Sequence, residues 1–384
     1  MTAASRQVVA GFIPLLDAAV LIAAREGGFA EREGIGLKLV RETSWANIRD
    51  RMAVGHFDVA HMLAPMPIAS TLKLTALPVP MRAAMVLGLG GNAITVSTAV
   101  AAGMANEGWD GTLDPLASGQ ALASHVRDRA TRGQSHLKFG VVHPFSGHAY
   151  ELRYWLAAAG LDPAVDVEIT VVPPRIMPDA LANHHLDGYC VGEPWNTVAV
   201  DAGAGRFATC KQLIWPNSPE KVLGATEAWA NAHPDTLVRL IRALGQAAAW
   251  CGDPRNTAAL AELLSGGEYL DCRPNECIPA LTGRLRVAGD RETHVPGFFQ
   301  FTGQAGAVPR REHGLWFYSQ MLRWRQISYS AEDADRVAAI FDGTMCRDAL
   351  GVAGPGDDAG RSDVAFFDRR RFDPAAVEDY ALSF

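Results

Sequence analysis

Short apolar runs alternate with amphipathic stretches through the first half of the chain, in the pattern of strands followed by helices. One series predicts strands at 36–40 and 58–62 and helices at 47–54 and 67–74. A second series predicts strands at 93–96, 138–142, 167–172 and 187–191 and helices at 149–159 and 177–184. Because strands that alternate with helices usually form a parallel sheet covered by those helices, the pattern predicts an α/β fold.

The apolar stretch at the N-terminus, residues 8–24, has two possible interpretations. It contains a strand-like run at 7–12, after which Asp17 is placed to cap a helix at 18–25. A secretion signal needs an unbroken apolar core, whereas Pro14 and Asp17 interrupt this one. The run is also shorter than the roughly 20 apolar residues that span a membrane. We therefore expect the fold to begin with this strand and the protein to be cytoplasmic.

The second half of the chain has mostly helical spacing of its apolar residues. Helices are predicted at 234–250 and 256–264, and the aromatic stretch 315–326 is expected to lie in the core. The segment 351–363 is rich in Gly and Asp, which predicts a mobile linker. The last residues, 364–384, would then either be mobile or pack against the rest of the protein.

Composition and charge narrow the class of protein. The 384 residues exceed what one hydrophobic core usually organises, so two lobes are expected. Hydrophobic residues make up 48% and charged residues 20%, which excludes a disordered chain. The net charge of -7 offers no overall attraction to polyanions and disfavours direct nucleic-acid binding. A small anionic ligand would therefore depend on a few locally placed donors.

Cysteine and histidine spacing predicts no metal site. The six cysteines include no C-x-x-C pair, so free thiols in a reducing compartment are expected. His56 and His61 would point to opposite faces of a strand, and His184 and His185 diverge near a helix end. The motifs H-E-x-x-H, G-x-S-x-G, G-x-G-x-x-G and the P-loop do not occur. We expect no catalytic residue and no cofactor, and therefore not an enzyme.

The segment 139–156 is the most informative candidate for anion binding. It predicts a strand, a turn and a helix, with Ser146, Gly147 and His148 at the helix N-terminus. Unpaired backbone N–H groups and the positive end of the helix dipole can hold an anion there. The same residues could equally form an ordinary helix cap.

Three further positions follow predicted strands or stand beside apolar runs. Segments 171–178 and 186–195 lie where open α/β sheets bind ligands, beyond the carboxyl ends of strands. Glu193 would repel an anion there unless a cation lay between, and a paired structural carboxylate is the alternative. Lys221 offers a positive charge, although lone lysines are usually exposed, and Trp45 could equally be a packing residue.

Five motifs together resemble one family of anion-binding proteins. They are S-W-A-N-I-R-D at 44–50, G-N-A-I-T-V at 91–96, G-H-A-Y-E-L-R-Y-W-L at 147–156, D-G-Y-C-V-G-E-P-W at 187–195 and P-E-K-V-L-G at 219–224. In this order they resemble the nitrate and bicarbonate binding proteins of ABC importers, the NrtA/CmpA family. The absent export signal makes the chain most similar to the cytoplasmic nitrate and nitrite sensors of the NasS type.

The resemblance implies a two-lobe, type II periplasmic-binding-protein-like fold with the ligand in an interlobe cleft. The lobes expected are 1–92 with 208–384, and 93–207. It also implies a partner, a NasT-like, RNA-binding antiterminator protein, held inactive until nitrate or nitrite binds. Genes for nitrate assimilation would then be controlled by the release of that partner.

The resemblance also implies the residues of the site. The nitrate-binding positions are Trp45, Asn92, His148, Pro174, Val191 and Lys221, with Ser146, Gly147 and Glu193 as a possible surrounding layer. Lys221 would supply the charge and Asn92 and His148 directional donors, while Trp45 forms a flat wall for a planar ion. Asn92 stands where the transport proteins have Gln, so its amide reaches less far.

Two other functions stay open. The chain could be the substrate-binding component of an ABC-type nitrate or bicarbonate importer, and bicarbonate recognition in the relatives involves a carboxylate and calcium, for which Glu193 is the candidate. It could also be an enzyme on the same fold, as in thiamine-pyrimidine synthesis, but the Cys-rich and His-rich iron motif of that enzyme is missing.

Overall fold

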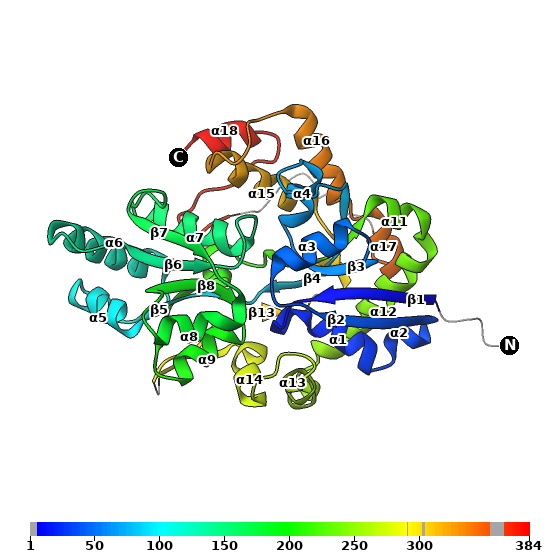
Figure 1. Cartoon of the computed structure of the whole chain (residues 1–384), viewed down its shortest axis with the longest axis horizontal. Helices are drawn as coiled ribbons and strands as arrows, with labels where there is room; N and C mark the ends of the chain where they lie inside the picture. Colours follow the sequence, from blue (N-terminus) through cyan, green and yellow to red (C-terminus); the bar gives the residue numbers. More distant parts are fainter. Residues whose placement is uncertain (1–5, 290, 302–303, 354–364) are drawn as a thin grey trace.

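The computed structural model describes residues 6–289, 291–301, 304–353 and 365–384. Its main strands form two separate sheets that lie side by side along the long axis of the molecule (Figure 1). Helices cover both faces of each sheet, which is the arrangement that the alternation of strands and helices predicts. The predicted linker at 351–363 lies, from residue 354 onward, outside the described residues.

The first sheet has six strands and mixed directions. Its order is β13 (Phe299–Gln300), β4 (Met81–Gly90), β10 (Pro219–Thr226), β3 (Val59–Leu63), β1 (Arg6–Phe12) and β2 (Ile35–Arg41). β1 is parallel to β2 and β3, as predicted, whereas β10 runs antiparallel to both β3 and β4. β4 thus runs in the same direction as β1, and β13 is antiparallel to it. The prediction of a parallel sheet is therefore wrong for β10 and β13, because an apolar run does not show the direction of its strand.

The second sheet has five strands and is also mixed. Its order is β7 (Val167–Val171), β6 (Leu137–Val141), β8 (Gly188–Gly192), β5 (Asn92–Ser97) and β9 (Gly205–Cys210). β6 is parallel to β7 and β8, as predicted. β5 is antiparallel to β8 and β9, so the prediction of a parallel sheet is wrong for the strand predicted at 93–96. A two-stranded hairpin, β11 (Arg284–Ala288) and β12 (Arg291–His294), forms a separate small sheet that packs near β9.

The chain crosses between the sheets at two places. Only Gly91 separates the end of β4 from the start of β5. The return runs from the end of β9 at Cys210 through α10 (Lys211–Ile214) to β10. The strands of the second sheet thus come from residues 92–210, while the lobe boundaries at 92/93 and 207/208 stay a prediction.

The helices follow the two sheets in chain order. Early helices near the first sheet are α1 (Ala19–Glu26), α2 (Phe29–Arg32), α3 (Trp45–Ala53) and α4 (Met66–Thr71), and the 3-10 turn η1 (Leu16–Ala18) precedes them. With the second sheet come α5 (Thr98–Asn106), α6 (Pro115–Thr131), α7 (Gly147–Ala158), α8 (Met177–Ala182), α9 (Trp195–Asp201) and the turn η2 (Pro174–Ile176). Among the described helices, each is too short or too polar to cross a membrane.

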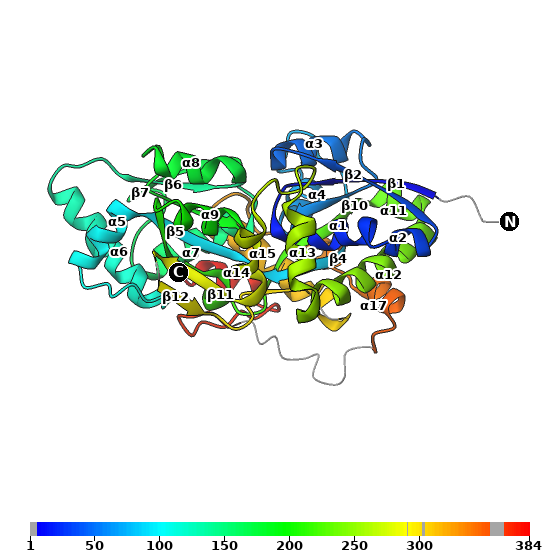
Figure 2. The same cartoon turned by 90° about the horizontal axis from the view of Figure 1, so that it is seen from below.

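The helices after β10 connect the two halves. They are α11 (Glu227–Ala232), α12 (Pro234–Cys251), α13 (Thr257–Ser265), α14 (Pro274–Thr282), α15 (Arg311–Arg323), α16 (Ala331–Ile340), α17 (Thr344–Leu350) and α18 (Val377–Leu382), with the turns η3 (Pro254–Asn256) and η4 (Gln304–Ala307). α13 contacts α1 and α14 contacts α9. Both helices lie below the sheets in Figure 1 and come to the front in Figure 2, which views the molecule from below. The segment therefore packs on both halves.

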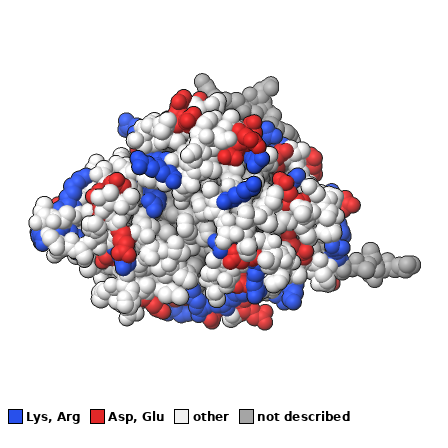
Figure 3. Space-filling model, turned by 45° about the horizontal axis from the view of Figure 1, so that its top comes forward, with Lys and Arg blue, Asp and Glu red and all other residues white. Residues whose placement is uncertain are grey.

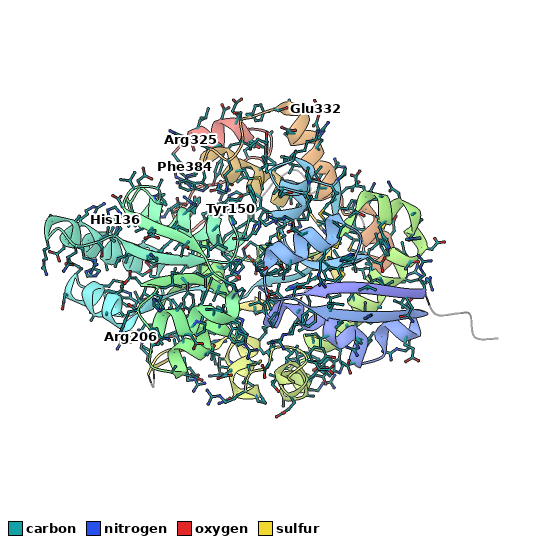
Figure 4. The ribbon with its side chains drawn as sticks, viewed as in Figure 1. His136, Tyr150, Arg206, Arg325, Glu332 and Phe384 are labelled. Carbon is teal, nitrogen blue, oxygen red and sulfur yellow. The ribbon has the colours of Figure 1, made fainter. Side chains whose placement is uncertain are left out.

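The C-terminal segment clasps the second half of the molecule. Phe366 stacks on Tyr154 of α7 with ring centroids 4.9 Å apart, and the Tyr154 hydroxyl donates to Asp368 Oδ2 at 3.0 Å. The guanidinium of Arg323 on α15 lies 3.4 Å from the ring centroid of Phe384, whose place above α7 is labelled in Figure 4. Trp316 of α15 is buried, as predicted for this aromatic stretch. The tail thus holds α7 from outside.

Gly90 at the first crossing allows us to predict a cost in stability. Its φ is +72°, and a Cβ there would meet the Phe298 carbonyl oxygen at 2.2 Å. Gly55 has a similar φ of +74° but open space around it. Gly55→Ala should cost about 1–2 kcal/mol of unfolding free energy for the left-handed backbone. Gly90→Ala should cost about 1–3 kcal/mol more, because the backbone must also move.

Chemical denaturation of both variants measures this difference. Equal destabilisation of Gly90→Ala and Gly55→Ala would contradict the close approach at the crossing.

Candidate functional site

Lys221 lies on β10 in the middle of the first sheet and is fully buried. Its Nζ contacts Asp17 Oδ2 at 2.7 Å and Glu220 Oε1 at 3.0 Å. The Trp45 ring faces the ammonium, with its centroid 5.5 Å from Nζ. Lys221 is therefore not the exposed lone lysine that statistics favour, because two carboxylates compensate its buried charge.

A β-bulge explains why two neighbours on one strand reach the same site. Successive side chains on a regular strand point to opposite faces. The register of β10 against β4 shifts between Pro219 and Lys221 and again between Lys221 and Val222. This irregularity lets Glu220 and Lys221 contact each other, while Glu220 reaches His148 and Lys221 reaches Asp17.

Asp17 and His61 complete the part of the site that the first sheet supplies. The predicted role of Asp17 as a helix cap is wrong, since α1 starts after Ala18 without a side-chain cap. The Asp17 carboxylate instead binds Lys221, and its Oδ1 lies 2.9 Å from His61 Nε2 on β3. His61 packs against Trp45 with ring centroids 5.3 Å apart.

The N-terminus of α7 brings His148 to the site from the second half of the molecule. Ser146 caps the helix, because its Oγ accepts a hydrogen bond from the Ala149 N–H at 3.0 Å. His148 Nδ1 then lies 3.3 Å from Glu220 Oε1. Gly147 is needed here for space, since a Cβ would lie 2.4 Å from Glu220 Oε2.

Lys211, Glu151 and Asn92 extend the site along the second sheet. Lys211 Nζ donates to Glu151 Oε1 and lies 3.2 Å from Glu220 Oε2. The Asn92 amide donates to Glu151 Oε2 at 3.2 Å. We call the seven charged or titratable residues the buried ionic cluster: Asp17, His61, His148, Glu151, Lys211, Glu220 and Lys221. They form a continuous series of contacts from the first sheet to the second.

Several polar atoms around this cluster have no hydrogen-bond partner within the described residues. They are His148 Nε2, His61 Nδ1, Trp45 Nε1 and Asn92 Oδ1. The side chains that carry them are at most 1% exposed. Buried polar atoms are nearly always hydrogen-bonded in folded proteins, so polar atoms without partners that gather at one place indicate a ligand site.

Burial and neighbouring charges shift the pKa values in opposite directions. Burial lowers the pKa of His148 to about 3 and also lowers that of His61, so both rings are neutral at pH 7. Burial alone would lower the pKa of Lys221, but Asp17 and Glu220 outweigh it and raise that pKa. Both buried lysines stay charged, since the carboxylates also raise the pKa of Lys211.

The pKa values of the three carboxyl groups in the cluster are also shifted in different directions. Burial alone would raise the pKa of Asp17 and of Glu220, but the adjacent cations outweigh it and lower both. Burial dominates at Glu151 and raises its pKa in spite of Lys211. Asp17 and Glu220 are therefore anionic at pH 7.

Val191 lies on β8 of the second sheet, and Glu193 directly follows the end of that strand. Val191 is paired with Ala93 in the β5–β8 register, one position from Asn92. Glu193 is buried, its Oε1 is without a hydrogen-bond partner among the described residues, and burial raises its pKa to about 7. The Glu193 carbonyl accepts from the Leu16 N–H at 2.8 Å, which links this loop to η1.

Pro174 is the site residue that the contacts do not bring to the cluster. It is buried at the start of η2. The next residue, Arg175, donates to Asp271 Oδ2 at 2.7 Å and lies over the Trp195 ring, 5.7 Å from its centroid. The contacts of the described residues thus place Pro174 near an arginine and an indole, and its role in binding stays a prediction.

Of the predicted positions, His148 and Lys221 both contact Glu220, and the Trp45 ring faces Lys221. Asn92 is connected to them through Glu151 and Lys211. Sequence reasoning missed five members of the cluster: Asp17, His61, Glu151, Lys211 and Glu220. Glu151 and Glu220 belong to two of the motifs that contain predicted ligand residues, His148 and Lys221. An acidic residue close to a predicted anion ligand could have indicated an ion pair in the site. The described residues contain no group of three or more His, Cys, Asp or Glu arranged to hold a metal ion.

Comparison with known proteins agrees with this architecture. Residues 2–265 match the NMT1-like family. The chain is 30% identical over 386 residues to the nitrate/nitrite binding protein NrtA of Synechococcus elongatus, covering 97% of this chain and 85% of that protein. It is 35% identical over 321 residues to the bicarbonate transport ATP-binding protein CmpC of the same species, covering 83% of this chain and 45% of that protein.

The fold is shared with a solved structure. The crystal structure of the periplasmic nitrate-binding protein NrtA from Synechocystis PCC 6803 matches with a TM-score of 0.87 and 26% identity, over 98% of both chains. This confirms the predicted fold class. The chain spans about half the length of the first curated relatives it matches, among them CmpC. The NrtA relatives are named as binding proteins rather than enzymes. From the family match and these likenesses, the chain belongs to the NMT1-like family and, within it, to the NrtA-like proteins.

Proposed function

We propose that the chain binds nitrate or nitrite at the buried ionic cluster and acts as a cytoplasmic sensor of the NasS type. The proposal rests on the buried polar atoms near Lys221, above all His148 Nε2 and Trp45 Nε1, that have no hydrogen-bond partner among the described residues. The likeness to NrtA, named as a nitrate/nitrite binding protein, supports this choice of ligand.

The chemistry of the donors suits a planar, weakly hydrated monoanion. Lys221 supplies a charge, His148 an imidazole donor and the Trp45 indole both a flat apolar face and an N–H. One Asn92 N–H is occupied by Glu151, which leaves its second N–H for a ligand. Asp17 and Glu220 beside Lys221 would repel an ion of higher charge, so a single negative charge is favoured.

Sensing would follow from the position of the site between the two sheets. An anion there contacts η1, α3 and β10 on one side and α7 on the other, so it stabilises one relative arrangement of the halves. A NasT-like antiterminator that binds the other arrangement better would be released. Charges of both signs are mixed over the face shown in Figure 3, which supports a protein partner rather than direct nucleic-acid binding.

A second candidate is the substrate-binding component of an ABC-type importer of nitrate or bicarbonate. The relatives NrtA and CmpC favour it, since their names are those of binding and transport proteins. Bicarbonate with calcium would draw on the free Oε1 of Glu193.

Replacement of Lys221 tests the proposed anion site. Lys221→Met should weaken nitrate binding at least about 100-fold, because a buried charge-assisted contact is lost. Isothermal titration measures this, with Lys138→Met as the matched control, since Lys138 is 41% exposed and pairs with Glu168 at 3.2 Å. Lys221→Met should also lose about 3–5 kcal/mol of stability, because Asp17 and Glu220 are left uncompensated.

Wild-type nitrate affinity in folded Lys221→Met would remove the lysine from the site. Binding of bicarbonate with calcium, and of neither nitrate nor nitrite, would favour the importer alternative.

Complex formation with the partner distinguishes a sensor from the binding component of an importer. The chain should form a complex with a NasT-like antiterminator on size-exclusion chromatography, and nitrate should dissociate it. By reciprocity the antiterminator should weaken nitrate binding by the same factor, about 5–150-fold for typical couplings. A chain that binds nitrate yet never forms this complex would contradict the sensor.

A further inference from the structure

The buried ionic cluster lacks the net positive charge that an anion site ordinarily has. Two charged lysines, Lys211 and Lys221, face three carboxyl groups, those of Asp17, Glu151 and Glu220. The net charge is minus one when Glu151 is ionised and zero when it is protonated. Both histidines are neutral at pH 7. The lysines are thus already compensated before any ligand arrives.

Addition of a monovalent anion would leave a buried negative charge without a counter-charge. Such a charge is strongly unfavourable in a site removed from water, and groups in that position change protonation instead. A cation must therefore accompany the anion or be produced by protonation of a residue in the cluster.

His148 is the residue placed to take up that proton. Its Nδ1 is 3.3 Å from Glu220 Oε1, while its Nε2 has no hydrogen-bond partner among the described residues. A neutral imidazole donates from one nitrogen only, whereas an imidazolium donates from both. A protonated ring could therefore satisfy Glu220 with one N–H and the anion with the other.

We propose that the cluster binds its anion together with one proton, which His148 holds between Glu220 and the anion. The inference rests on the proposed anion-binding function and adds a second ligand, the proton, to the same site. Nitrate or nitrite plus the proton amounts to uptake of the conjugate acid, so the complex has the same net charge as the free protein.

The charged groups around His148 and its burial explain why its ring is neutral before an anion binds. Glu220 on β10 and Asp17 on η1 favour the imidazolium, and Lys221 on β10 and Lys211 on α10 oppose it. The positive end of α7 opposes it as well. Burial decides the balance and keeps the pKa near 3. A ligand anion adds a further negative charge beside the ring, which raises the pKa of His148 in the complex.

The sign of the pH dependence follows from the two pKa values. At pH values between that of the empty site, about 3, and the higher one of the complex, binding takes up a proton. In that range the affinity falls as pH rises, up to tenfold for each pH unit. Above the pKa of the complex the dependence disappears.

Isothermal titration with sodium nitrate in two buffers, PIPES and Tris, tests the proposal on the full chain. The observed enthalpy should vary with the ionisation enthalpy of the buffer, with a slope of about one proton taken up per nitrate. The affinity should weaken by up to tenfold between pH 6 and 7 and again between pH 7 and 8. Nitrate binding with a buffer-independent enthalpy and a flat pH profile would overturn the proton and leave the anion site intact. No nitrate binding at all would overturn both.

The variant His148→Gln tests whether His148 is the residue that holds the proton. Glutamine keeps a neutral N–H donor but cannot be protonated, so nitrate should bind more weakly and without proton uptake. The matched control is His136→Gln, since His136 is exposed and Figure 4 labels it on the second half of the molecule, away from the junction of the two halves. Proton uptake retained in His148→Gln would overturn the assignment to His148.

Discussion

The series of buried ion pairs that runs from Asp17 through Lys221, Glu220 and Lys211 to Glu151 is the constraint on which the site depends. Buried charges are tolerated only when they are paired, so each member requires its neighbours. The β-bulge at the start of β10 and the missing side chain at Gly147 both serve this series, because they bring Glu220 within reach of α7. Local backbone irregularities are thus explained by electrostatics.

The same series unites the two halves of the molecule. Apart from this series, three features join the halves. They are the chain crossings at Gly91 and α10, the loop around Glu193 and the helices after β10. The contact between Lys211 and Glu220 adds an ion pair across the junction, near the buried polar atoms that have no partner among the described residues. A ligand that enters there competes with these internal pairs, so its binding free energy reflects rearranged pairs as well as new contacts.

Much of the secondary structure could be predicted from the sequence, because periodicity is a local property. The runs that become β1, β3 and α7 appear at nearly their observed bounds. Strand direction and ionic pairing could not be predicted, since they depend on residues far apart in the chain. Lys221 and Asp17 are separated by 204 positions, and no local pattern distinguishes an aspartate that caps a helix from one that binds a distant lysine. The resemblance to a family found Trp45, His148 and Lys221, but not the carboxylates that surround them.

The C-terminal clasp has a practical consequence for work on this protein. Phe384, the last residue, packs edge-on against Tyr154 and Tyr380 and lies under the guanidinium of Arg323. Tyr154 belongs to α7, the helix whose first turn carries His148. An affinity tag fused after Phe384 would begin inside this aromatic contact and could shift the helix beneath it. Anion affinities measured with a C-terminal tag should therefore be compared with those of the chain after tag removal.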